Sequence, residues 1–244
     1  ITIVDNSEDS VLRNLSVTNN ARHGIYVTSA IGEISASVVT SNVNRGIYVL
    51  NQEGLVLADN VVDDHLDYGI YFEAIAGDLS IISGNTVSGT DQGIHARAFT
   101  GSAEVRDNHV FDNRMDGIEG YGDVLVIGNA VHDNIGRGVF ARRGTDVTEN
   151  VVFGNSVGIE LDRNQIAGDL SAALNNRVYD NSTVGILAYE VNDVIGNVVY
   201  SNPTGIYAAS THSSSHFSGL IAGNVVYANT GYAIRVSNGA NLEL

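Results

Sequence analysis

Several residue types are missing from this chain, and each absence narrows what the protein can be. The 244 residues include no cysteine, one proline and no lysine, since all 12 basic residues are arginine. Without cysteine there is no disulfide bond, no thiolate nucleophile and no zinc site built from cysteine. A single proline argues against a linker-rich protein. No apolar run reaches the roughly 18 residues that a membrane-spanning helix needs.

The chain carries a strong excess of negative charge, with 28 acidic residues and a formal net charge of −16. Such a surface repels phosphate groups, so we expect no nucleic-acid partner and no insertion into a membrane. With 43% hydrophobic and 16% charged residues, the chain can bury a sizeable core. This balance favours an extracellular or cell-surface protein. The first residue, Ile1, indicates a piece of a longer chain.

A glycine followed by isoleucine or valine recurs about every 23 residues. The glycines are Gly24, Gly46, Gly69, Gly93, Gly117, Gly138, Gly158, Gly185 and Gly205, and Ala233 stands where a tenth would fall. The pattern Asn-x-Val-x-x-Asn precedes the later glycines and begins at Asn108, Asn129, Asn150, Asn176, Asn197 and Asn224. An apolar residue also stands three positions before most of the first asparagines, as Val126 does before Asn129.

Each repeat therefore contains three short apolar segments separated by glycine and asparagine. Their period-two alternation indicates strands, and no stretch keeps the 3.6-residue period of a helix. Three strands per coil predict one all-β domain over residues 1–244, a right-handed parallel β-helix of about ten coils. Intervals of 27 residues after Gly158 and 28 after Gly205 predict longer turns near 162–171 and 210–218.

The repeated asparagines have a structural explanation. Asparagine tolerates a left-handed backbone, and its amide can bond the equivalent asparagine one coil away, because successive coils lie about 4.8 Å apart. We therefore expect ladders of asparagine side chains along the solenoid rather than a ligand site.

One candidate site emerges when the sequence is aligned coil by coil. The side chains two and four positions after each glycine point outward, and the residue before the glycine flanks them. On four adjacent coils these positions hold Tyr68, Tyr71, Glu73, His95, Arg97, Asp116, Glu119, Tyr121, Arg137 and Arg142. Aromatic rings cover sugar C–H faces, arginines hold uronate carboxylates, and carboxylates accept hydrogen bonds from hydroxyl groups. The pattern predicts a groove for an acidic polysaccharide, with a salt-bridged solvated strand face as the alternative.

The repeat resembles that of the right-handed parallel β-helix superfamily, whose members include pectate lyases, mannuronan C5-epimerases and surface adhesins. The order of residues within each coil is similar to that in the mannuronan C5-epimerases, whose active-site coil reads Tyr-Gly-Phe-Asp-Pro-His. The matching coil here runs from Tyr68 to Glu73 and keeps the Tyr-Gly pair, but Tyr71 and Glu73 replace the motif's aspartate and histidine. The resemblance implies a carbohydrate-related β-helix in which this catalytic motif is not preserved.

If the face is catalytic, it would act on a uronate as an epimerase or a lyase. His95 is the candidate base, because its ordinary pKa lies near neutrality, and Tyr68 or Tyr71 is the candidate acid. Substrate binding is assigned to Glu73, Arg97, Asp116, Glu119, Tyr121, Arg137 and Arg142.

The competing hypothesis is a non-catalytic rod of a larger cell-surface or fibre protein, whose partners are neighbouring domains of the same chain. No cofactor and no metal ligand set are predicted. The net charge leaves calcium open as an alternative, although the chain has no Gly-Gly-x-Gly-x-Asp repeat.

Overall fold

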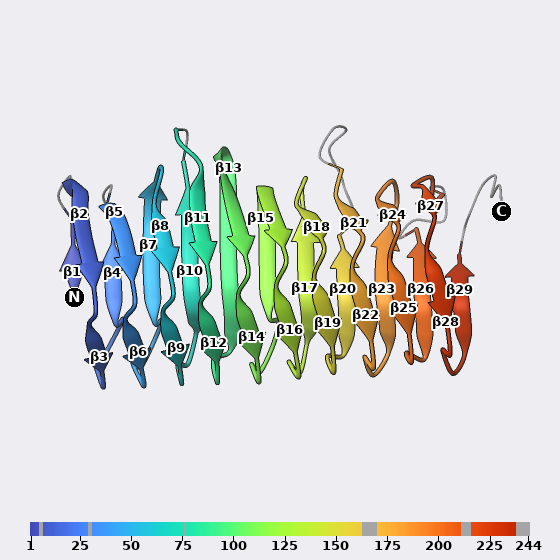
Figure 1. Cartoon of the computed structure of the whole chain (residues 1–244), viewed down its shortest axis with the longest axis horizontal. Helices are drawn as coiled ribbons and strands as arrows, with labels where there is room; N and C mark the ends of the chain where they lie inside the picture. Colours follow the sequence, from blue (N-terminus) through green and yellow to red (C-terminus); the bar gives the residue numbers. More distant parts are fainter. Residues whose placement is uncertain (5–6, 29–30, 76, 163–169, 211–215, 238–244) are drawn as a thin grey trace.

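The computed structural model describes residues 1–4, 7–28, 31–75, 77–162, 170–210 and 216–237. In this part the chain forms a single stack of coils that follow one another along the long axis in sequence order (Figure 1). All pairings between the described strands are parallel, and each strand pairs with its equivalent one coil away. Tyr71, for example, lies opposite Tyr48 in the preceding coil and His95 in the following one. The two longer turns predicted near 162–171 and 210–218 lie mostly outside the described residues, which exclude 163–169 and 211–215.

Each complete coil contributes a strand to each of three columns. The first column comprises β1 (Thr2–Ile3), β4 (Ile25–Val27), β7 (Ile47–Gln52), β10 (Tyr68–Ala74), the start of β13 (Gln92–Arg106) and of β15 (Ile118–Ile127), β17 (Arg137–Arg142), β20 (Val157–Leu161), β23 (Val184–Tyr189), β26 (Thr204–Ala209) and β29 (Tyr232–Val236). The second comprises β2 (Ser7–Arg13), β5 (Ile31–Ser35), β8 (Val56–Ala58), β11 (Ser80–Ser83), the ends of β13 and β15, β18 (Asp146–Thr148), β21 (Ala172–Leu174), β24 (Asp193–Ile195) and β27 (Ile221–Ala222). The third comprises β3 (Ser16–Thr18), β6 (Val38–Thr40), β9 (Val61–Asp63), β12 (Thr86–Ser88), β14 (His109–Phe111), β16 (Ala130–His132), β19 (Val151–Phe153), β22 (Arg177–Tyr179), β25 (Val198–Tyr200) and β28 (Val225–Tyr227). The prediction of three short strands per coil is confirmed.

The core is a continuous column of aliphatic side chains inside the coils. The residue after each repeat glycine is fully buried, for example Ile70, Ile94 and Ile118. The valines of the asparagine motif, such as Val110 and Val131, are equally buried, except that Val226 in the last described coil is only partly buried. Because the alternation directs the same position inward in every coil, stacking buries a face that one coil could not bury alone.

The repeat glycines are required by close packing. A Cβ atom added at Gly138 would lie 2.5 Å from Val152 Cγ1 and 2.7 Å from the carbonyl oxygen of Gly158 in the next coil. Neither group can retreat, because one belongs to the core and the other to the backbone. Ala233 occurs in the last described strand of this column, which has no described neighbour beyond it.

The predicted asparagine ladders are present. In the ladder before the third column, Asn108 Nδ2 donates to Asn129 Oδ1 and Asn129 Nδ2 to Asn150 Oδ1, both at 2.9 Å. A second ladder runs after the third column, with Asn134 donating to Asn155 at 2.9 Å. The expected left-handed backbone, however, lies one residue earlier than the ladder positions, as at Asp107, where φ is 55°.

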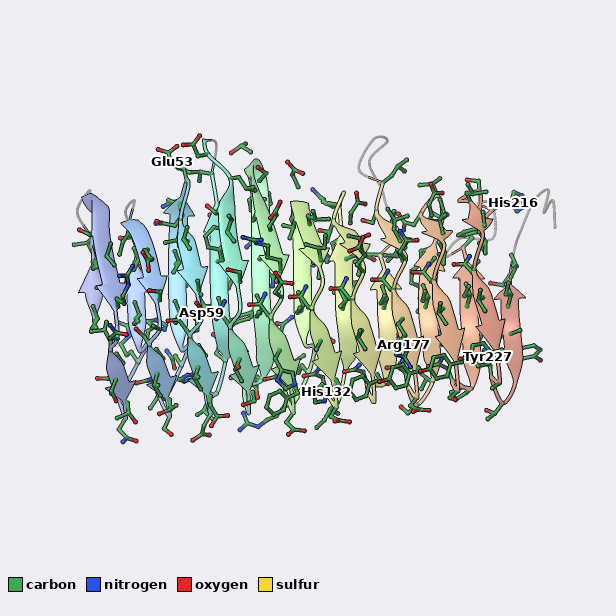
Figure 2. All side chains as sticks on the ribbon, viewed as in Figure 1. Glu53, Asp59, His132, Arg177, His216 and Tyr227 are labelled. Atoms are coloured by element: carbon green, nitrogen blue, oxygen red, sulfur yellow. The ribbon has the colours of Figure 1, made fainter. Side chains whose placement is uncertain are left out.

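The outward face of the third column carries a stack of six rings. They belong to Phe111, His132, Phe153, Tyr179, Tyr200 and Tyr227. Successive ring centroids lie 4.6 to 5.3 Å apart, with interplanar angles of 4° to 11°. Figure 2 shows His132, Arg177 and Tyr227 along this row of coils. The rings face one another because equivalent positions repeat at the coil spacing.

Candidate functional site

The predicted site residues lie on the outward face of β10, β13, β15 and β17. Backbone pairing sets Tyr71, His95 and Glu119 in one row. Glu73, Arg97, Tyr121 and Arg142 form a second row beside it. The structure thus brings the predicted residues together, but the first row is less open than expected. Tyr71, His95 and Glu119 are only 7–8% exposed, because neighbours one coil away cover them.

Glu119 is the electrostatic centre of this face. Its Oε2 atom lies 2.9 Å from His95 Nδ1 and accepts a hydrogen bond of 2.7 Å from Gln92 Nε2. Its Oε1 atom accepts a bond of 3.1 Å from Arg142 Nη1. Burial alone would raise the pKa of Glu119, but the hydrogen bond and charge of His95, together with the bonds from Arg142 and Gln92, lower it from 4.5 to about 2. Glu119 therefore remains an anion at any ordinary pH.

This lowered pKa predicts a loss of stability in acid. Glu119 has its ordinary pKa of 4.5 when unfolded, so its contribution is complete above that pH and is lost as the pH falls through about 2. The contribution is about 3 kcal/mol, because one pKa unit corresponds to about 1.4 kcal/mol. Urea unfolding of the wild type and Glu119→Gln at pH 7, 4 and 2 measures it. The difference in free energy of unfolding should shrink toward pH 2, and a difference that is constant across this range would contradict the prediction.

The two nitrogen atoms of His95 are in different environments. A carboxylate can only accept, so His95 Nδ1 carries the proton that is donated to Glu119. His95 Nε2 is buried and has no hydrogen-bond partner in the part of the chain that the structure describes. In neutral histidine this second nitrogen carries a lone pair. Buried polar atoms are seldom left unpaired, so an unpaired one marks a site of interest.

Two tyrosine rings surround the His95 imidazole. Tyr71 stacks on it with centroids 4.9 Å apart at 13°, and Tyr68 meets it at 5.2 Å and 62°. The Tyr71 hydroxyl accepts a hydrogen bond of 2.8 Å from Arg97 Nη1. Burial, followed by the charges of Asp67 and Glu119, raises the pKa of Tyr68, so that its hydroxyl keeps its proton at neutral pH.

The remaining predicted groups are paired to different extents. Asp116 accepts two hydrogen bonds from the Arg137 guanidinium, at 3.0 and 2.8 Å, and a third from the Arg137 backbone. Arg142 also donates to Asp162 at 3.1 Å. Glu73 forms no hydrogen bond or ion pair with any described residue. Burial opposes a rise in the pKa of Arg97, but the hydrogen bond to Tyr71 and the charges of Tyr71 and Glu73 together raise it.

Sequence reasoning missed several groups at this face. Gln92 stands directly before a repeat glycine, in the same flanking position as Tyr68, and this position was the available signal. Glu160 continues the first row beyond Phe140, and its burial raises its pKa. The aromatic row also extends the other way, from Tyr71 to Tyr48 and Tyr26. A cavity of about 450 Å³ lies at that end and is lined by Thr2, Arg22, His23, Tyr26 and Tyr48.

The described residues contain no group of three or more histidine, aspartate or glutamate side chains arranged to hold a metal ion. Nor do they contain a helix with the length and apolar character needed to cross a membrane.

Comparison with solved structures identifies several similar folds. The A-module of the mannuronan C-5 epimerase AlgE4 of Azotobacter vinelandii has a TM-score of 0.76 at 16% identity, over 98% of this chain and 76% of that one. The A-module of AlgE6 from the same organism has a TM-score of 0.66 at 17% identity, over 90% and 68%. The periplasmic alginate epimerase AlgG has a TM-score of 0.61 at 14% identity, over 94% and 74%. At these identities the similarity establishes the fold.

No curated protein sequence matches the chain. A family model does, and its description is "right handed beta helix region"; it matches residues 2–119 and 80–219. These matches confirm the resemblance drawn from the repeat and the right hand of the coils. The chain therefore belongs to the right-handed β-helix family.

Proposed function

We propose that this chain binds an acidic polysaccharide on the outward face of the first column and removes the C5 proton of a uronate unit, with His95 as the base. The observation that carries the proposal is the pair of His95 and Glu119. One nitrogen of the imidazole is fixed by a carboxylate, and the other is left with an unshared lone pair. A carboxylate in this position orients the imidazole and stabilises the imidazolium that forms when the base takes a proton.

The neighbouring groups supply the other roles that the reaction needs. Arg97 uses one hydrogen bond on Tyr71, so its guanidinium can also neutralise the substrate carboxylate, which makes the C5 proton more acidic. His95 Nε2 takes the proton, and the electron pair of the C5–H bond moves into the carboxylate as an enolate. Tyr68, whose raised pKa keeps it protonated, is the proton donor. Because His95 Nε2 is buried, a neighbouring side chain has to move before a substrate can reach it.

Two outcomes are open to the enolate. Return of a proton to C5 from the opposite face inverts the uronate, and Tyr68 is regenerated by solvent. Cleavage of the C4–O bond instead leaves a C4–C5 double bond, and the proton passes to the leaving oxygen. The names of the similar solved structures, mannuronan C-5 epimerase and alginate epimerase, support the first outcome. AlgG is periplasmic, which supports the extracellular or cell-surface location that we propose for this chain.

Proton NMR in D₂O tests the proposal. The protein is incubated separately with mannuronan, mixed alginate and pectate, and the C5 signals are followed with time. Loss of the C5 proton signal by deuterium exchange identifies an epimerase, and new signals of unsaturated ends identify a lyase. Unchanged spectra with all three polymers would reject the catalytic proposal.

A non-catalytic rod is the second candidate, and one observation favours it. Several charged groups on this face already pair with one another, as Asp116 does with Arg137 and Arg142 with Asp162. Titration calorimetry with oligouronates separates the two candidates, because a rod should give no saturable binding at this face.

A further inference from the structure

A cavity of about 420 Å³ lies beside the candidate site, where the chain passes from the first column to the second within β13 and β15 and just after β17. It is lined by Ala98, Phe99, Tyr121, Gly122, Asp123, Arg143, Gly144 and Leu170. Of the predicted site residues only Tyr121 lines the cavity. The cavity therefore adjoins the outward face that carries His95, here called the His95 face, without being part of it.

Aromatic and apolar groups form one wall of this cavity. The rings of Phe99 and Tyr121 meet edge to face, with centroids 5.1 Å apart at 64°. Phe99 is 51% exposed and Leu170 is 52% exposed, so neither side chain is buried in the core. Exposed aromatic faces of this kind bind the C–H faces of sugars.

The cavity also holds an arginine, Arg143, that has no anionic partner among the described residues. Three guanidinium groups surround the Tyr121 ring: Arg97 at 5.5 Å, Arg142 at 5.4 Å and Arg143 at 5.2 Å. Arg97 and Arg142 are engaged by other side chains of the His95 face. Arg143 forms no ion pair or side-chain hydrogen bond with the described residues. Arg143 is exposed, so its guanidinium is available to the carboxylate of a bound ligand.

Two glycines and one carboxylate also line the cavity. Gly122 and Gly144 have φ values of 86° and 89°, and a Cβ atom at Gly122 would collide with the carbonyl oxygen of Ala98. Asp123 is exposed in the lining. This carboxylate would accept hydrogen bonds from sugar hydroxyl groups, which a free sulfate ion does not offer. A uronate unit matches all three features, because it has a carboxylate, hydroxyl groups and an apolar C–H face.

We infer that this cavity is a second uronate subsite, which holds a unit of the polymer that is not the one reacting at His95. Arg143 holds the carboxylate, Asp123 accepts the hydroxyl hydrogens, and Phe99 with Tyr121 covers the C–H face. The inference rests on the proposed function, since it assumes the same acidic polymer on the adjoining face.

The test is calorimetric titration of the intact chain with a uronate tetramer and with the same tetramer after reduction of its carboxyl groups. Arg143→Gln should weaken binding of the uronate tetramer tenfold or more, because a charge-assisted bond to a carboxylate is lost. It should leave binding of the reduced tetramer unchanged. Arg177→Gln is the matched control: it removes the same charge from an exposed arginine of the third column and should alter the uronate affinity less than twofold.

The outcomes separate this inference from the proposal on which it rests. If the wild type binds no uronate oligomer, both fail. If the wild type binds the uronate tetramer and Arg143→Gln binds it equally well, the subsite is rejected while the proposed function stands. Equal affinity of the wild type for the reduced and unreduced tetramers would also reject the subsite. Melting temperatures of both variants within a few degrees of the wild type ensure that any change reflects binding.

Discussion

His95→Gln is expected to lower the rate of deuterium exchange at the uronate C5 by at least a hundredfold, since a positioned general base contributes about 10²–10⁴ in rate. Glutamine preserves an N–H donor toward Glu119 but has no basic nitrogen, so it keeps the buried hydrogen bond and removes the lone pair. The rate is measured by proton NMR in D₂O with whichever polymer the wild type modifies.

The matched control for this variant is His109→Gln. His109 is exposed on the third column, away from the proposed chemistry, and its replacement should leave the exchange rate unchanged. A His95→Gln protein that retains full activity would remove His95 as the base and direct attention to Glu73, which forms no ion pair with the described residues. A companion variant, Glu119→Gln, should retain part of the activity, because it keeps an acceptor for His95 but loses the charge that stabilises the imidazolium.

The largest effect on stability is expected from Asn129→Ala. The Asn129 side chain donates to the carbonyl oxygens of Val105 and Ile127 and to Asn150 Oδ1, and it accepts from both the backbone and the side chain of Asn108. Removal of this buried amide leaves several polar groups unpaired, each of which costs about 1–3 kcal/mol. We expect a loss of about 3 kcal/mol or more in the free energy of unfolding, measured by urea denaturation.

Asn224→Ala provides the comparison within the same ladder. Asn224 is only half-buried, and its amide donates to a single described acceptor, the carbonyl oxygen of Val194. Its replacement should cost clearly less than that of Asn129. Equal losses at the two positions would show that ladder burial is not what makes these asparagines stabilising.

The fold could be predicted from the sequence because the repeat encodes it redundantly. A position such as Val131 recurs in every coil with the same inward direction, and period-two alternation around it admits only a strand. The turn backbone was less predictable. The left-handed residue is the one before the ladder asparagine, such as Asp107 or Glu149, and many residue types tolerate this position when the ladder fixes the next residue.

The candidate site was predictable only as rows of residue types. Coil alignment correctly set His95 beside Glu119, because parallel pairing determines which residues are neighbours. It could not reveal how deeply that row is covered, since this depends on the rotamers of side chains such as Tyr68. The cavity at Phe99 and Arg143 was also missed, because these residues follow the repeated strand positions, where the length of the coils varies.

The asparagine ladders also bear on how a chain of this kind changes in length during evolution. The segment between bonded ladder residues is 21 residues from Asn129 to Asn150 and 26 from Asn150 to Asn176, yet the same contact forms in both. Insertions are therefore neutral to the ladder when they fall in the turns between its positions. Duplication or deletion of a whole coil merely brings another equivalent pair of asparagines into contact. Lineages can thus lengthen or shorten the solenoid by one coil at a time while the surface of each remaining coil diverges independently.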